Sequence, residues 1–181
     1  MDPERISERA SDYTIEYSKD EKGRLRKKSV YKGPEFYYVL PNEVRMKARL
    51  LLAAFIILSV VFTMIPLLVA DQLMHKWYTS LPLIVCLFGD VHLIMAFVRF
   101  VTSKEPLKRE DNRACFERLA IWSLLNTIFS FTSLSGQIIW HFKNGFQTLD
   151  TLITVSTLLL LVSSILVFNA KGCAEAKEQK G

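Results

Sequence analysis

The chain has 181 residues, of which 50% are hydrophobic and 23% are charged, and its formal net charge is +5. The mean hydropathy is +0.21, and the apolar residues gather into long runs, which excludes an ordinary soluble domain and a disordered protein. We therefore expect one compact unit, an all-α membrane protein that forms a four-transmembrane-helix up-down bundle.

The polar segment before the first apolar run, residues 1–41, is expected to form an N-terminal cytoplasmic tail. Within it, Tyr13, Ile15 and Tyr17 alternate with polar residues, as on a β-strand with one apolar face. The segment that follows contains Gly23 and is typical of a turn leading into a second strand. The sequence therefore predicts a short cytoplasmic β-hairpin over residues 13–32.

Basic residues crowd the second half of this hairpin, at Arg24, Arg26, Lys27 and Lys28. One interpretation is contact with anionic lipid headgroups, at about 1 kcal/mol per basic residue near the surface. The other is a solvated topology signal that keeps the tail in the cytoplasm. Because a lone hairpin is marginally stable in water, we expect it to pack against the membrane, the bundle, a partner or a second copy.

The bundle is expected to occupy residues 42–170, with Asn42 as the N-cap of the first helix. At a rise of 1.5 Å per residue, the first apolar run is long enough to cross a hydrocarbon core about 30 Å thick. Short outer connections favour antiparallel neighbours. The expected spans are about 50–70, 80–101, 119–142 and 152–170, and residues 171–181 are expected to form a C-terminal cytoplasmic tail.

The placement of Lys and Arg predicts the orientation of the bundle. Of the 23 basic residues, only Lys76 and Lys143 fall in the connections on one side, and the other 21 lie on the opposite side. The positive-inside rule therefore predicts that both termini are cytoplasmic. This rule explains the basic excess without a nucleic-acid partner. The minimal outer surface favours a multi-pass protein of a bacterial cytoplasmic membrane.

Asp90 and His92 are the main candidates for a functional role inside the membrane, because both fall near the midpoint of the second span. An ionised Asp at a helix centre costs roughly 2.5–3.5 kcal/mol on insertion scales, so we expect Asp90 to face the bundle interior and to have a partner. Two residues correspond to about 200° around a helix, so Asp90 and His92 do not share a face. For His92, a satisfied interior histidine is the alternative interpretation.

A polar stripe marks the third span, where the intervals of four, three and four place its members on one helix face. Its members are Asn126, Ser130, Ser133 and Gln137. One hypothesis is that this stripe lines a hydrated path with Asp90 midway. The alternative is interhelical hydrogen bonding, which contributes about 0.6 kcal/mol per contact in membrane proteins.

The sequence contains no recognisable catalytic set, because no pair of acid–base groups converges and no H-E-x-x-H or Walker A motif occurs. Cys86, Cys115 and Cys173 form no C-x-x-C motif, and none lies in an outer connection, so no extracytoplasmic disulfide is expected. The sequence predicts neither a metal site nor a cofactor. We expect a protein that is not an enzyme.

The function predicted from these features is association, as a subunit or regulator of a larger membrane complex. The expected partners are the lipid bilayer and another membrane protein or a second copy of the chain. The alternative is a small homo-oligomeric proton-coupled transporter that uses Asp90 as its intramembrane protonation site. An intramembrane enzyme that uses Asp90 or His92 is a third hypothesis, and it lacks a convergent pair of groups.

Overall fold

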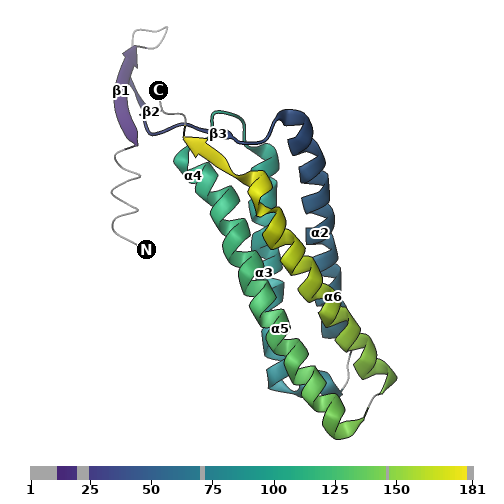
Figure 1. Ribbon diagram of the computed structural model, residues 1–181. Coiled ribbons are helices and arrows are strands. Elements are labelled where there is room, and N and C mark those ends of the chain that lie inside the picture. Colours follow the sequence, from purple (N-terminus) through teal and green to yellow (C-terminus); the bar gives the residue numbers. More distant parts are fainter. Residues whose placement is uncertain (1–11, 20–24, 70–71, 146, 179–181) are drawn as a thin grey trace.

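The computed structural model of the protein describes residues 12–19, 25–69, 72–145 and 147–178. Within these ranges, four helices are long and apolar enough to cross a membrane. Successive helices run antiparallel, and each packs against two neighbours, so that the four form a closed ring (Figure 1). The ring order is α2 (Asn42–Leu68), α3 (Trp77–Thr102), α5 (Arg118–Asn144) and α6 (Thr148–Ala170).

The helices extend beyond several of the expected spans, most of all at the start of the third helix. The third helix begins well before residue 119, because α4 (Arg109–Asn112) and the π-helical turn η2 (Arg113–Glu117) run directly into α5. The predicted N-cap is wrong by one residue: Pro41 occupies the cap position of α2 and Asn42 is already helical. The Asn42 side chain instead accepts a hydrogen bond from Arg45 one turn later.

Strands β1 (Tyr13–Lys19) and β2 (Leu25–Tyr31) form the antiparallel pair that the alternating pattern predicts. Directly opposite residues share a face of the hairpin, and Tyr13 lies opposite Tyr31 at its base. The predicted turn at residues 20–23 lies outside the described residues. We call these two strands the hairpin arm.

A second strand pair was not predicted. Strand β3 (Phe36–Tyr38) pairs with β4 (Ala176–Glu178), which follows α6 through the 3₁₀ turn η3 (Lys171–Ala174). The main chain of Phe36 also exchanges two hydrogen bonds with that of Leu107, in the connection after α3. Three separate parts of the chain therefore meet at one end of the bundle and close it.

Side chains reinforce this closed end. Arg45, which is only 8% exposed, contacts both Asn42 and Glu105, and its guanidinium lies 4.5 Å from the centroid of the Tyr38 ring. The Tyr38 ring packs edge-on against Phe100, with 5.5 Å between centroids. These contacts tie the start of α2 to the end of α3 and to the β3–β4 pair.

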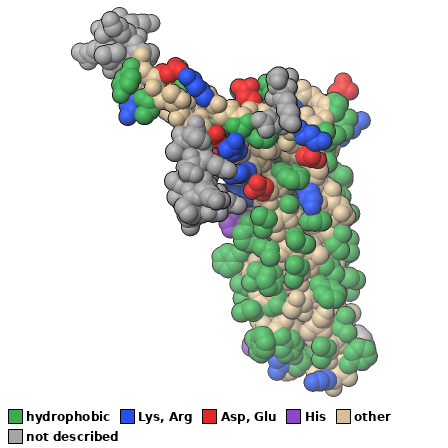
Figure 2. Space-filling model, turned by 60° about the vertical axis from the view of Figure 1, so that its left-hand side comes forward, with side chains coloured by type: hydrophobic (Ala, Val, Ile, Leu, Met, Phe, Trp, Pro, Cys, Tyr) green, Lys and Arg blue, Asp and Glu red, His purple; other side chains and the backbone are tan. Residues whose placement is uncertain are grey.

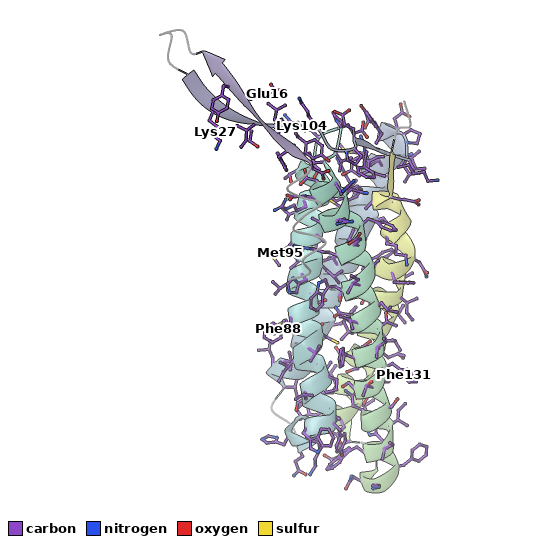
Figure 3. All side chains as sticks on the ribbon, turned by 90° about the vertical axis from the view of Figure 1, so that its left-hand side faces the viewer. Glu16, Lys27, Phe88, Met95, Lys104 and Phe131 are labelled. Carbon is purple, nitrogen blue, oxygen red and sulfur yellow. The ribbon has the colours of Figure 1, made fainter. Side chains whose placement is uncertain are left out.

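The two kinds of surface are separated along the bundle. Hydrophobic side chains cover the length of the helices in Figure 2, and acidic and basic side chains gather at the end that carries the strands. Phe88, Met95 and Phe131 are labelled examples that project outward from α3 and α5 (Figure 3). The interior, by contrast, contains buried Ser, Thr, Asn, Gln and Asp side chains between apolar layers.

Candidate functional site

Asp90 lies near the middle of α3 and is 1% exposed, so it faces the bundle interior as predicted. Its Oδ1 accepts hydrogen bonds from the Ser59 hydroxyl at 2.7 Å and from the Asn126 amide at 2.9 Å. Its Oδ2 lies 2.7 Å from the Thr63 hydroxyl. One carboxyl group therefore joins α2, α3 and α5. We call Asp90, Ser59, Thr63 and Asn126 the carboxyl cluster.

Ser59 and Thr63 were not predicted as site residues. They are the only hydroxyl-bearing residues between positions 50 and 70, and they lie four apart, on one face of α2. Both are fully buried. That isolated pair in an otherwise apolar run is the sequence signal that would have pointed to a polar contact on the first helix.

Gly89 gives the Asn126 amide its place beside Asp90. A Cβ added at Gly89 would lie 2.8 Å from Asn126 Cγ and would overlap its Oδ1. Only a residue without a side chain leaves room for this approach between α3 and α5. The glycine before Asp90 thus belongs to the geometry of the carboxyl cluster.

His92 does not join the carboxyl cluster, in keeping with the predicted angular separation from Asp90. Its ring stacks on that of Trp122 of α5, with 4.1 Å between centroids and 13° between planes. The side chain is partly exposed. The contact is a packing arrangement between α3 and α5 and brings no second acid–base group toward Asp90.

The predicted polar stripe lies on the buried face of α5. Ser133 donates to the main-chain carbonyl of Thr79 on α3 at 2.9 Å, and Gln137 donates to the Thr157 hydroxyl on α6 at 3.0 Å. Ser130 instead bonds within its own helix, to the carbonyl of Thr127. Asn126, Ser133 and Gln137 therefore connect helices, the arrangement expected of interhelical hydrogen bonding.

The hydrogen bonding continues toward the end of the bundle opposite the strands. His141 Nε2 lies 2.8 Å from Thr154 Oγ1, and the Trp140 indole N–H donates to Asp150 Oδ2 at 3.0 Å. The ammonium group of Lys76 lies 5.0 Å from the centroid of the Trp140 ring. These contacts join the ends of α5 and α6 and bring the start of α3 to them.

The base of the hairpin arm is fixed to the start of α4. The main-chain N–H of Arg109 donates to Tyr31 Oη at 3.1 Å, and Tyr31 in turn donates to the Pro34 carbonyl at 2.9 Å. Arg109 Nη1 also lies 3.6 Å from Asp12 Oδ1, and Lys108 lies over the Tyr31 ring at 5.5 Å. Burial raises the pKa of the Tyr31 phenol above its ordinary value.

Beyond this base, the hairpin arm rises from the end of the bundle, with Glu16 and Lys27 out along its strands (Figure 3). Ile15 is 50% exposed and Tyr17 is 68% exposed. Lys27 lies opposite Tyr17 and is also exposed. Of the four residues predicted to contact lipid headgroups, Lys27 is thus the one whose side chain is described. Arg26 and Lys28 belong to strand β2, and Arg24 lies outside the described residues.

Within the described part of the chain, no group of three or more His, Cys, Asp or Glu side chains is arranged to hold a metal ion. Family models, curated protein sequences and solved structures were all compared with this chain, and none of them matches it.

Proposed function

We propose that the protein is a multi-pass membrane protein with both termini in the cytoplasm, as in a bacterial cytoplasmic membrane, and that it acts by association with another membrane protein. The four apolar helices support insertion. The 21-to-two division of basic residues supports the orientation. Trp77 and Phe142, which are 74% and 88% exposed at the end opposite the strands, suit the outer interface.

The observation that carries the association proposal is the hairpin arm, which is fixed at its base and exposed at the described side chains of residues 14–17. Tyr31 and Asp12 hold the base against Arg109, so the arm has a defined place at the end of the bundle. Ile15 and Tyr17 on the same face are at least half exposed. A two-stranded hairpin is marginally stable in water unless a further surface covers it. We infer that this face of the arm binds the partner protein.

A pair of substitutions on neighbouring residues tests this proposal. Ile15→Glu places a charge on the apolar face, and Thr14→Glu places the same charge on the opposite face of the same strand. Both substitutions remove a β-branched residue, so their effects on strand propensity are matched. The variants are expressed at native level, extracted in mild detergent and compared by mass and protein content.

The expected result is that Ile15→Glu loses the partner and that Thr14→Glu keeps it. If both variants keep the same assembly, the apolar face of the hairpin arm is not the docking surface. If the lost component is a second copy of the chain, the partner is a homo-oligomer subunit instead of another protein.

A second candidate function is proton-coupled transport, and the carboxyl cluster favours it. A buried carboxyl at mid-span is rare in membrane helices and is characteristic of proton relays. In Asp90→Asn, the new amide occupies the same volume and cannot take up a proton. We expect proteoliposomes containing this variant to lose the proton uptake that the unaltered protein catalyses under an imposed pH gradient. Equal uptake by both proteins would contradict this candidate.

A further inference from the structure

The two oxygens of Asp90 have unequal surroundings. Oδ1 accepts from two donors, the Ser59 hydroxyl at 2.7 Å and the Asn126 amide at 2.9 Å. An amide NH₂ group can only donate, so Oδ1 is in place as an acceptor. Among the residues that the structure describes, Oδ2 has one hydrogen-bonding neighbour, the Thr63 hydroxyl at 2.7 Å. A hydroxyl both donates and accepts, so the neighbour of Oδ2 can serve either form of the carboxyl group.

The Thr63 hydroxyl has a choice of acceptors. Its oxygen lies 2.7 Å from Asp90 Oδ2 and 2.9 Å from the main-chain carbonyl of Ser59, and its single hydrogen cannot serve both. The Ser59 carbonyl lies four residues before Thr63 within α2, so it also has a helical N–H as donor. It therefore keeps a partner when the Thr63 hydrogen points to Asp90.

We propose that Asp90 Oδ2 is a reversible proton-binding site and that the Thr63 hydroxyl changes its hydrogen-bond direction as the proton binds. Without the proton, Thr63 donates to the carboxylate. With it, a new O–H bond at Oδ2 donates to Thr63 Oγ1, and the Thr63 hydrogen turns to the Ser59 carbonyl. The proton comes from water or a buffer acid and returns there, and no electrons are transferred. Both states satisfy every group of the pair with the same heavy-atom positions.

The charged and titratable groups around Asp90 do not prevent it from binding and releasing a proton. On α3 itself, Cys86 lies one turn away and contacts the main-chain carbonyl of Asn126, and His92 is turned toward Trp122. From α2 and α5, the groups that face Asp90 are the neutral Ser59, Thr63 and Asn126 side chains. Among the described residues, no Lys, Arg or His side chain pairs with Asp90 and fixes it as the anion.

This inference deepens the transport candidate, since it rests on the same assignment of Asp90, and it concerns binding alone. Proton-coupled transport needs a proton site of this kind. The site can bind a proton even if the protein transports none. Infrared spectroscopy measures the bound state, and proton flux measures transport, so the two can fail separately.

The test is infrared difference spectroscopy on the full chain in lipid vesicles, over a range from about pH 4 to about pH 10. The expected result is a protonated-carboxyl C=O band that disappears as pH rises and is lost in Asp90→Asn. In Thr63→Val, the Oδ2–H group loses its acceptor, so the band is expected to shift to higher wavenumber. Thr63→Ser restores the hydroxyl and should restore the band position.

Thr132→Val is the matched control, because Thr132 makes the same bond to its own helix, to the Ile128 carbonyl at 2.9 Å, but is exposed on the outer face of α5. It should leave the band unchanged. A band that is absent or constant over the whole pH range would overturn the proposal. The proposal would also be overturned if Thr63→Val left the wavenumber of the band unchanged. Thr63→Ser and Thr132→Val show whether the fold tolerates substitution of these threonines. A titrating band with no proton flux would retain the binding site and refute transport.

Discussion

Gly89→Ala is expected to push α3 and α5 apart at the carboxyl cluster. The added Cβ would lie 2.8 Å from Asn126 Cγ, whereas carbon atoms in favourable contact are about 3.5–4.0 Å apart. Relief of the overlap requires the Asn126 side chain to move. Its amide would then lose the 2.9 Å hydrogen bond to Asp90 Oδ1.

The magnitude follows from three terms. Overpacking a filled interior costs about 1–3 kcal/mol. A lost hydrogen bond between membrane helices adds about 0.6 kcal/mol. Against these, alanine is a better helix former than glycine by about 1 kcal/mol. The net expectation is a decrease of about 0.6–2.6 kcal/mol in the free energy of unfolding.

Unfolding in mixed micelles, driven by increasing SDS and followed by circular dichroism, measures this decrease. Gly172→Ala is the control, because a Cβ at that position meets no atom within 4 Å. Asn126→Ala removes the amide that the new Cβ meets, so Gly89→Ala should cost less in that background. A Gly89→Ala variant as stable as the unaltered protein, or a loss of stability that is the same in both backgrounds, would contradict this overlap with Asn126.

Three further predictions concern the end of the bundle that carries the strands. Burial raises the pKa of Tyr38 to about 12, so its neutral phenol stabilises the fold fully below about pH 10 and loses this effect as pH rises toward 12. Alkaline absorbance titration should show one late-titrating phenol that is absent from Tyr38→Phe; identical curves would contradict the assignment. Arg45→Lys should lower stability by about 1 kcal/mol in the SDS assay, because an ammonium group cannot reproduce the planar contacts to Glu105 and Tyr38; unchanged stability would count against it. Tyr31→Phe removes the acceptor of the Arg109 N–H, so trypsin should cut the hairpin arm faster, and equal cleavage rates would show that this bond does not hold its base.

Much of the fold could be predicted from local patterns. Four apolar runs of sufficient length predict four long helices, and the alternation from Tyr13 to Tyr17 predicts a strand. The burial of Asp90 follows from the cost of a carboxyl group that faces lipid. Each of these inferences depends on residues close together in the chain, or on one residue and its solvent.

The remaining features depend on residues far apart in the sequence. To predict the contact of Asp90 with Ser59 and Thr63, one must know which face of α2 meets α3. The periodicity of an almost uniformly apolar helix does not define such a face. The β3–β4 pair joins two three-residue strands from opposite ends of the chain, too short to show a repeating pattern. Asn42 has the chemistry of a cap, but Arg45, which is also paired with Glu105, donates a hydrogen bond to its side chain in the folded protein.

Association through the hairpin arm is tested most directly by the mass and protein content of the particle extracted in mild detergent at native expression level. We expect an assembly that contains a second membrane protein, that is lost in Ile15→Glu and that is retained in Thr14→Glu. A monomer, or an assembly that Ile15→Glu leaves intact, would contradict association through the hairpin arm.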